Sequence, residues 1–278
     1  AAEGFAIAEA LYPAGHPARH RIIGSHEDLQ SLTVEDVATF LSQWYGPANA
    51  TLAISGDIAP GQTRALVNKW FADLPGSGQE PVRPVWPPPA LNADVERTIE
   101  DPFTKVGRVH MAWPSPPITT TEDGAFDLLA FILADPRVGR LWNASPFDVF
   151  LDVSAYQLSR EQGSEFHISI DGATQSVVSA AKRSILEVLQ DIATRGVTPV
   201  DLARARESYE TSLNQGLETL SGRTNWFQLL NRIATAPNDF AWLRRRWDLA
   251  SPQVIRDLAT QLLGSRRVTV VTLPKGGL

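Results

Sequence analysis

Three of the five histidines lie close together near the start of the chain, and their type and spacing could bind a metal. His16 and His20 are four residues apart, which is the spacing of two ligands on one face of a helix. Gly15 and Pro17 flank His16, however, and proline disfavours a regular helix at that point. The sequence therefore does not support a metal site built from these two histidines and His26.

The other chemistry-bearing residues show no catalytic pattern. The sequence contains no His-x-x-Glu-His, His-Glu-x-x-His, Gly-x-Ser-x-Gly or glycine-rich phosphate motif. It also contains no cysteine, which excludes thiol catalysis, iron–sulfur clusters and Cys-ligated zinc. His110 and His167 lie in predicted strands, where we expect hydrogen-bonded structural histidines. Acidic residues such as Glu122 and Asp123 stand at predicted helix starts, where the helix dipole is a sufficient reason for them.

From these residues alone we assign no catalytic and no metal-binding residue, and the substrate-binding residues stay unknown. Composition narrows the class of protein further: the 278 residues are 43% hydrophobic and 20% charged, which is typical of a globular protein. The net charge is -6, which argues against binding to nucleic acid or to an anionic membrane. We expect the basic cluster Arg244 to Arg246 to be a solvated helix face. No stretch approaches the roughly 18 apolar residues of a membrane span.

A proline-rich segment, residues 75–93, divides the chain and has the composition of an extended linker. We therefore predict one domain over 1–74 and another over 94–278. Before the linker, the opening residues indicate the end of a helix, and Thr33-Val-Glu-Asp36 is close to a capping box that starts a helix over 34–46. A strand over 49–57 and a second helix over 60–74 are predicted to follow, each helix with an apolar stripe.

After the linker the pattern is that of an α+β protein. The predicted strands are 95–101, 105–114, 148–156, 164–172 and 266–274. The predicted helices are 120–134, 174–195, one that starts at Thr198-Pro199, 222–235, 239–248 and one capped by Ser251-Pro252.

One internal repeat is visible. Residues 33–52 match residues 251–270 at a constant offset of 218, so that Val37 corresponds to Ile255 and Phe40 to Leu258. A capped helix, a glycine and a strand are expected in both segments. The match is either a chance coincidence of a common unit or the trace of a duplicated domain of somewhat over 200 residues, of which the first copy is cut short at its N-terminal side.

Several motifs in a fixed order carry a resemblance to a known family. The segments "LYPAGHP" and "IIGSHEDLQSLTVEDVATFLSQWYGPANATLAISGD" resemble the pitrilysin/insulinase family of zinc metallopeptidases, which includes mitochondrial processing peptidase. In the second half, "FILADPRVGRLW" and "GVTPVDLARAR" resemble that family's C-terminal domain. The resemblance covers nearly the whole chain apart from the proline linker.

The resemblance implies a duplicated two-layer fold, a mostly antiparallel or mixed sheet covered by helices, with two halves that enclose a peptide or unfolded polypeptide. The family binds zinc through an inverted His-x-x-Glu-His motif, which this sequence lacks. The resemblance therefore implies that zinc belongs to the parent protein upstream of this chain, with no cofactor expected in the chain itself. The implied partner is the missing N-terminal segment or a homologous subunit.

Two functions follow from the resemblance. The chain is either the portion of a zinc metalloendopeptidase that encloses and binds extended peptides, or a non-catalytic structural subunit that pairs with an active partner. The family's second half often carries an Arg and a Tyr that hold substrate, but between Arg140 and Tyr156 no such pair can be assigned. This departure keeps the second alternative open.

Overall fold

The computed structural model describes residues 2–20, 22–74, 81–144, 149–234 and 236–276. Its contacts divide the chain into two compact units. Unit 1 consists of Ala1–Arg21, Trp86–Glu210 and Ala241–Leu278, and unit 2 consists of Ile22–Val85 and Thr211–Phe240. Each unit thus combines segments that lie far apart in the sequence. The domains predicted over 1–74 and 94–278 are copies of a sequence repeat, which is a different division from these compact units. The predicted domain boundaries therefore stay a prediction.

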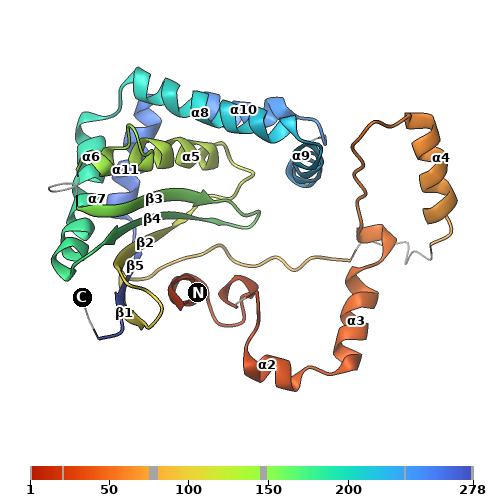
Figure 1. Cartoon of the computed structure of the whole chain (residues 1–278), viewed down its shortest axis with the longest axis horizontal. Coiled ribbons are helices and arrows are strands. Elements are labelled where there is room, and N and C mark those ends of the chain that lie inside the picture. The colour runs from red at the N-terminus through yellow and green to blue at the C-terminus, as the bar shows by residue number, and fades with distance from the viewer. Residues whose placement is uncertain (1, 21, 75–80, 145–148, 235, 277–278) are drawn as a thin grey trace. The chain divides into compact units, whose positions relative to one another are not determined.

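Unit 1 is built on a mixed sheet whose five strands, within the described ranges, follow the order β1-β5-β2-β4-β3 (Figure 1). The strands are β1 (Val95–Asp101), β2 (Gly107–Ser115), β3 (Phe150–Leu158), β4 (Ser164–Gly172) and β5 (Val268–Pro274). β1 and β5 are parallel, and the other neighbouring pairs are antiparallel. The predicted α+β fold with a mixed sheet covered by helices is confirmed.

Strand register decides which side chains share a face, because successive residues of a strand point to opposite sides. β4 is buried along its whole length. Its apolar residues Phe166, Ile168 and Ile170 alternate with its polar residues, so one face of the strand is apolar and the other is polar. The polar residues are Glu165, His167, Ser169 and Asp171.

Helices α5 (Thr121–Ala134), α7 (Gln175–Arg195) and α11 (Pro252–Gly264) lie over the apolar face (Figure 1). Phe126 of α5 packs on Phe166 of β4 with ring centroids 5.1 Å apart. Trp113 of β2 donates its indole N–H to the carbonyl of Leu262 on α11 at 3.0 Å. A buried tryptophan needs such an acceptor, so this bond fixes α11 against the sheet.

Helix α1 (Ala2–Leu11) lies against the other face, next to β5 and β1 (Figure 1). Its apolar residues form a small core with side chains of β2 and β5. The buried members are Ala6, Ile7, Leu11, Tyr12, Ala112, Val268 and Val270. Burial of this apolar surface, worth about 25 cal/mol per Å², stabilises the packing of α1 on the sheet.

The other described elements of unit 1 are the 3-10 turn η1 (Pro17–Arg19), α6 (Arg140–Asn143), all but the first residue of α10 (Phe240–Asp248) and the first part of α8 (Pro199–Glu218). The second part of the predicted linker also packs here. The backbone N–H of Trp86 donates to Gln162 at 2.7 Å. Pro89 lies so close to Gly163, which has a φ of +128°, that a Cβ there would be 2.6 Å from the proline ring. The remaining linker residues 75–80 lie outside the described residues.

Unit 2 contains α2 (His26–Ser31), α3 (Val34–Trp44), the turn η2 (Pro47–Asn49), α4 (Pro60–Phe71) and α9 (Leu220–Ile233). The predicted capping box at the start of α3 is confirmed. The Thr33 hydroxyl accepts from the Asp36 N–H at 3.2 Å, and the Asp36 carboxylate accepts from the Thr33 N–H at 2.9 Å. These bonds satisfy two amide groups at the helix start and explain why α3 forms.

The strand predicted over 49–57 is wrong, because these residues form the end of η2 and an irregular segment. A strand needs a neighbouring strand to bond its backbone, and here the carbonyl of Thr51 instead accepts from the side-chain amide of Gln228 on α9 at 3.1 Å. The predicted apolar stripes of α3 and α4 are present but are not covered. Phe40 is 54% exposed and Trp70 is 67% exposed.

Candidate functional site

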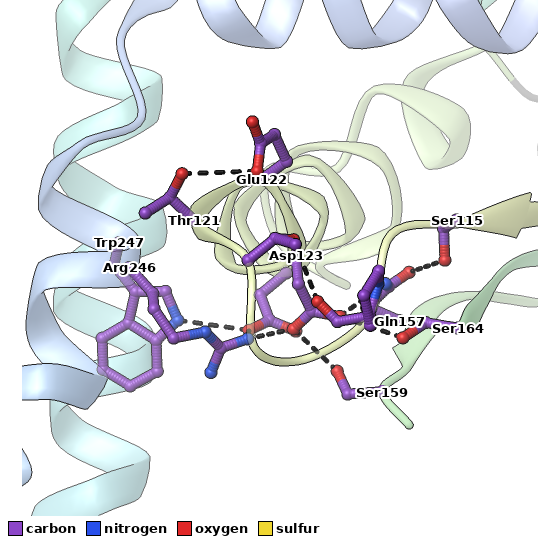
Figure 2. Close-up of polar contacts among 12 residues, drawn as sticks. Ser115, Thr121, Glu122, Asp123, Gln157, Ser159, Ser164, Arg246 and Trp247 are labelled. Carbon is purple, nitrogen blue, oxygen red and sulfur yellow. Dashed lines mark hydrogen bonds and ion pairs between the residues drawn. The ribbon is translucent and has the colours of Figure 1, made fainter. Parts of the chain in front are cut away.

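A cluster of buried polar side chains lies on the helix-covered side of the sheet in unit 1. At its centre is Asp123, which is fully buried in the first turn of α5. Its carboxylate accepts hydrogen bonds from Gln157 at 2.8 Å, Ser159 at 2.9 Å and Ser164 at 3.3 Å, and it pairs with Arg246 (Figure 2). The helix dipole alone was expected to explain Asp123, but these bonds give it a tertiary role as well.

Arg246 corrects a second prediction, since it was expected on a solvated face and is only 5% exposed. It reaches Asp123 from α10 because Gly124 has no side chain. A Cβ at Gly124 would lie 2.6 Å from the Cβ of Arg246. Arg244 of the same helix instead donates to Glu210 at 2.7 Å and is half-exposed. Arg246 is buried and Arg244 is half-exposed because Arg246 packs on Gly124. The sequence pattern does not reveal this tertiary contact.

Asp127 lies beside this pair on α5, and 18% of its side chain is exposed. Its carboxylate accepts from the indole N–H of Trp247 at 3.2 Å and lies 3.8 Å from a guanidinium nitrogen of Arg246. Burial raises the pKa of Asp127 to about 7, since desolvation outweighs the attraction of Arg246. The cluster therefore holds one carboxylate that binds a proton near neutral pH.

We expect the Asp127→Asn variant to lose a pH dependence that the natural chain shows. A carboxyl group whose pKa is raised on folding stabilises the fold at low pH, and this contribution is lost as the pH rises through about 7. The natural chain should therefore lose on the order of 3 kcal/mol between pH 5 and pH 8 from this group, whereas the asparagine of the variant keeps the acceptor for Trp247 and titrates nothing. Urea unfolding at pH 5 and pH 8 measures this difference. An equal change in the free energy of unfolding in the two proteins would contradict the raised pKa of Asp127.

A second polar cluster lies on the opposite face, between the sheet and α1. His110 of β2 bonds through Nδ1 to Glu3 of α1 and through Nε2 to Nδ1 of His167 on β4, at 2.9 Å. Nε2 of His167 bonds to Glu165 at 3.2 Å. Glu165 also accepts from the hydroxyl of Tyr12 at 2.7 Å. The expectation of hydrogen-bonded strand histidines is confirmed, but their contact with each other was not predicted.

Charges and rings surround this second cluster. Arg160 donates to Glu165 at 3.2 Å, and the ring of Tyr156 stacks on His167 with centroids 4.7 Å apart. Burial opposes ionisation of Glu165, but its bonds to His167 and Tyr12 and the charge of Arg160 outweigh burial and lower its pKa. Burial lowers the pKa of the His167 imidazole. The arrangement therefore favours ionised carboxylates next to a neutral His167.

These residues do not fit a zinc site. Within the described parts of the chain, no group of three or more His, Asp or Glu side chains is arranged to hold a metal. The nitrogens of His110 and His167 point at each other, whereas metal ligands must converge on one point. Nδ1 of His16 accepts from the backbone of Ala18 at 3.0 Å and caps η1. His20 follows that turn, and His26 begins α2 in unit 2.

The polar face of the sheet ends at β3, the last strand in the sheet order. Two apolar side chains of β3 are partly exposed, Leu151 at 53% and Leu158 at 37%. Tyr156 lies between them in sequence and is 40% exposed. A polar face beside a terminal strand with exposed apolar side chains can bind an extended peptide, which joins a sheet through its backbone. No described helix is long and apolar enough to cross a membrane.

Comparison with known proteins decides the family. Residues 31–209 match the model of the peptidase M16 inactive domain, which is more than half of the chain. This chain belongs to the peptidase M16 family. The resemblance to zinc metallopeptidases without the zinc motif is thereby confirmed, and the match extends over parts of both compact units.

Individual relatives agree with the family. The chain is 21% identical over 213 residues to the zinc protease PqqE of Helicobacter pylori, covering 74% of this chain and 47% of that protein. A solved protease from Helicobacter pylori has the same fold, with a TM-score of 0.85 and 16% identity over 98% of this chain and 66% of that one. A peptidase M16 inactive domain from Pseudomonas fluorescens gives a TM-score of 0.83 and 16% identity over 98% and 65%. The chain spans about half the length of the curated relative.

Proposed function

We propose that this chain is the part of a zinc metalloendopeptidase that encloses and binds extended peptides, and that the catalytic zinc is held by a segment upstream of it. The observation that carries the proposal is the uncovered apolar surface of unit 2. Val37, Phe40 and Leu41 of α3 are 45% to 54% exposed, and a monomeric protein rarely leaves such a patch in water.

The internal repeat indicates what covers this surface. Ile255 and Leu258 of α11 correspond to Val37 and Phe40 at the offset of 218, and both are buried beside the sheet of unit 1. β5 lies between β1 and β2, and it follows α11 as residues 50–56 follow α3. We infer that α3 packs under a second sheet, as α11 packs on the sheet of unit 1. The occupant is an upstream first-copy segment, so residues 1–74 complete the first domain, 75–93 link the domains and 94–278 form the second.

A second candidate function has its own support. The interval between Arg140 and Tyr156 lacks the Arg/Tyr pair that the family resemblance implies for many active relatives. A non-catalytic subunit paired with an active homologous partner would show this feature. In that case the surface of α3 would still be covered by a first-copy sheet, but the covering segment would lack a working His-x-x-Glu-His motif.

Peptide binding by the sheet is tested with a matched pair of variants. Leu158→Asp places a charge on β3 beside the polar face, whereas Leu249→Asp makes the same change at a 61% exposed residue that follows α10. Fluorescence anisotropy with fluorescein-labelled casein peptides should show binding by the natural chain and by Leu249→Asp, and at least about tenfold weaker binding by Leu158→Asp. Equal affinity of the two variants would exclude β3 as the binding strand.

A further inference from the structure

The second polar cluster forms an arc of hydrogen bonds that begins and ends on the same segment. It starts at Glu3 in the first turn of α1, crosses His110 on β2 and His167 on β4, and reaches Glu165. Glu165 then accepts from Tyr12, the residue directly after α1. The arc therefore ties both ends of α1 to the sheet, on either side of the apolar contacts made by the middle of the helix.

The hydrogen bonds of the arc require a definite number of protons. Its three contacts, Glu3 to His110, His110 to His167 and His167 to Glu165, each need one proton between the two heavy atoms. Ionised carboxylates only accept, so all three protons must come from the two rings. Two neutral imidazoles carry two protons, which leaves one contact with lone pairs on both sides. A third proton on the ring pair completes every contact.

We propose that His110 and His167 form a buried binding site for one proton, with the positive charge on His110, and that this proton fastens α1 to the sheet. His110 then donates from Nδ1 to Glu3 and from Nε2 to His167. Neutral His167 accepts at Nδ1 and donates from Nε2 to Glu165. The site is independent of the proposed peptidase role, because it rests only on contacts within unit 1.

The surrounding charges favour the bound proton. Negative groups outnumber positive ones around the two rings, so an added positive charge is attracted. Two carboxylates bond directly to the rings, Glu3 of α1 and Glu165 of β4, and the charge of Arg160 from the β3–β4 turn acts on His167. Arg108 of β2 interacts with Glu3, with Asp152 of β3 and with Asp171 of β4, and it is bonded to Asp171. The polar neutral groups are Tyr12, Tyr156 and Thr272.

The pKa shifts of the two carboxyl groups and of His167 agree with this charge distribution. Burial opposes ionisation of Glu3, but the hydrogen bond and charge of His110 outweigh burial and lower the pKa of that carboxyl. Glu165 has a lowered pKa as well, so both ends of the arc stay ionised. Burial lowers the pKa of His167, which disfavours a positive charge on that ring.

The lowered pKa values also fix the direction of the acid response. A group whose pKa falls on folding stabilises the fold above its ordinary pKa, and this contribution is lost as the pH falls through the lowered value. Glu3, Glu165 and His167 all belong to this class. Acid therefore breaks the arc by protonating its acceptors.

Nitrogen-15 NMR of the histidine rings in the full chain tests the site. At pH 7 the rings should carry three protons, with both nitrogens of His110 protonated and only Nε2 of His167 protonated. The measurement uses the natural chain, so it requires no substituted protein. Two neutral rings at pH 7, or a positive charge on His167, would overturn the proposal.

Two variants of α1 separate the proton site from ordinary helix docking. Glu3→Gln removes the negative end of the arc, so the third proton should leave and amide exchange of α1 should become at least about tenfold faster. Glu9→Gln removes another carboxylate of α1, one that bonds to Arg97 at 2.6 Å and does not touch the rings. It should leave both ring protonation states unchanged. Loss of the third proton in Glu9→Gln, or its retention in Glu3→Gln, would contradict the proposal.

Discussion

Replacing Asp123 by alanine is expected to destabilise unit 1 by about 3–5 kcal/mol, the usual cost of breaking a buried ion pair from one side. The change removes the acceptor of Arg246 and of three further side chains while leaving the guanidinium 5% exposed. Arg246 already has one buried nitrogen, Nε, without a partner among the described residues. It would then have little compensation for its lost hydration.

Glu210→Ala is the matched control, because Glu210 is also a carboxylate bonded to an arginine of α10, but at a half-exposed position. Surface pairs of this kind contribute about 0–1 kcal/mol. Denaturant unfolding should therefore separate the two variants clearly. The double variant Asp123→Ala/Arg246→Met should regain part of the loss, since no unpaired charge stays buried. A loss below about 1 kcal/mol for Asp123→Ala would show that the cluster is not the anchor of α5 and α10.

Alanine at Leu258 is expected to cost about 2–5 kcal/mol, while alanine at its repeat counterpart Phe40 should change the free energy of unfolding by less than about 0.5 kcal/mol. Leu258 is 5% exposed inside the helix layer of unit 1, so truncation leaves a cavity. Phe40 is 54% exposed, so truncation removes little buried surface. Truncation at the same repeat position is therefore costly in α11 and nearly neutral in α3.

The contrast should shrink when the proposed first-copy segment is present. Once a sheet covers α3, Phe40 becomes a core residue and its truncation should approach the cost at Leu258. The free energy of unfolding is measured for Phe40→Ala and Leu258→Ala, each with and without the added segment. Each variant is compared with the unsubstituted protein of the same length. A Phe40 cost that stays near zero in the longer protein would mean that α3 is not covered in the way the repeat predicts.

The sequence predicted elements well where the signal is local. Capping residues such as Thr33, Thr174 and Ser251 place helix starts within a residue, because the bonds they make involve only the next turn. Alternating or fully apolar runs likewise located the strands of unit 1. Residues 49–57 have the same local signal but form no strand, since a strand depends on partners that local sequence does not contain.

The polar clusters could not be predicted for a related reason. The contact between His110 and His167 depends on the register of β2 against β4, in which Ala112 lies opposite His167. A shift by one residue would send one ring to the other face, and nothing in the sequence fixes that shift. Arg246 was assigned to solvent because three consecutive arginines suggest exposure. Gly124, 122 residues earlier, is the residue that lets one of them into the core.

If this M16 chain binds peptides without holding the catalytic zinc, as we propose, zinc content and peptide cleavage should both depend on the upstream segment. We would express this chain alone and joined to the proposed upstream segment, and measure zinc by elemental analysis and hydrolysis of a quenched peptide mixture. We expect no stoichiometric zinc and no cleavage for this chain, and one zinc with chelator-sensitive cleavage for the longer protein. A longer protein without zinc would favour the non-catalytic subunit. Stoichiometric zinc with chelator-sensitive cleavage in this chain alone would contradict the proposal that the catalytic zinc lies upstream.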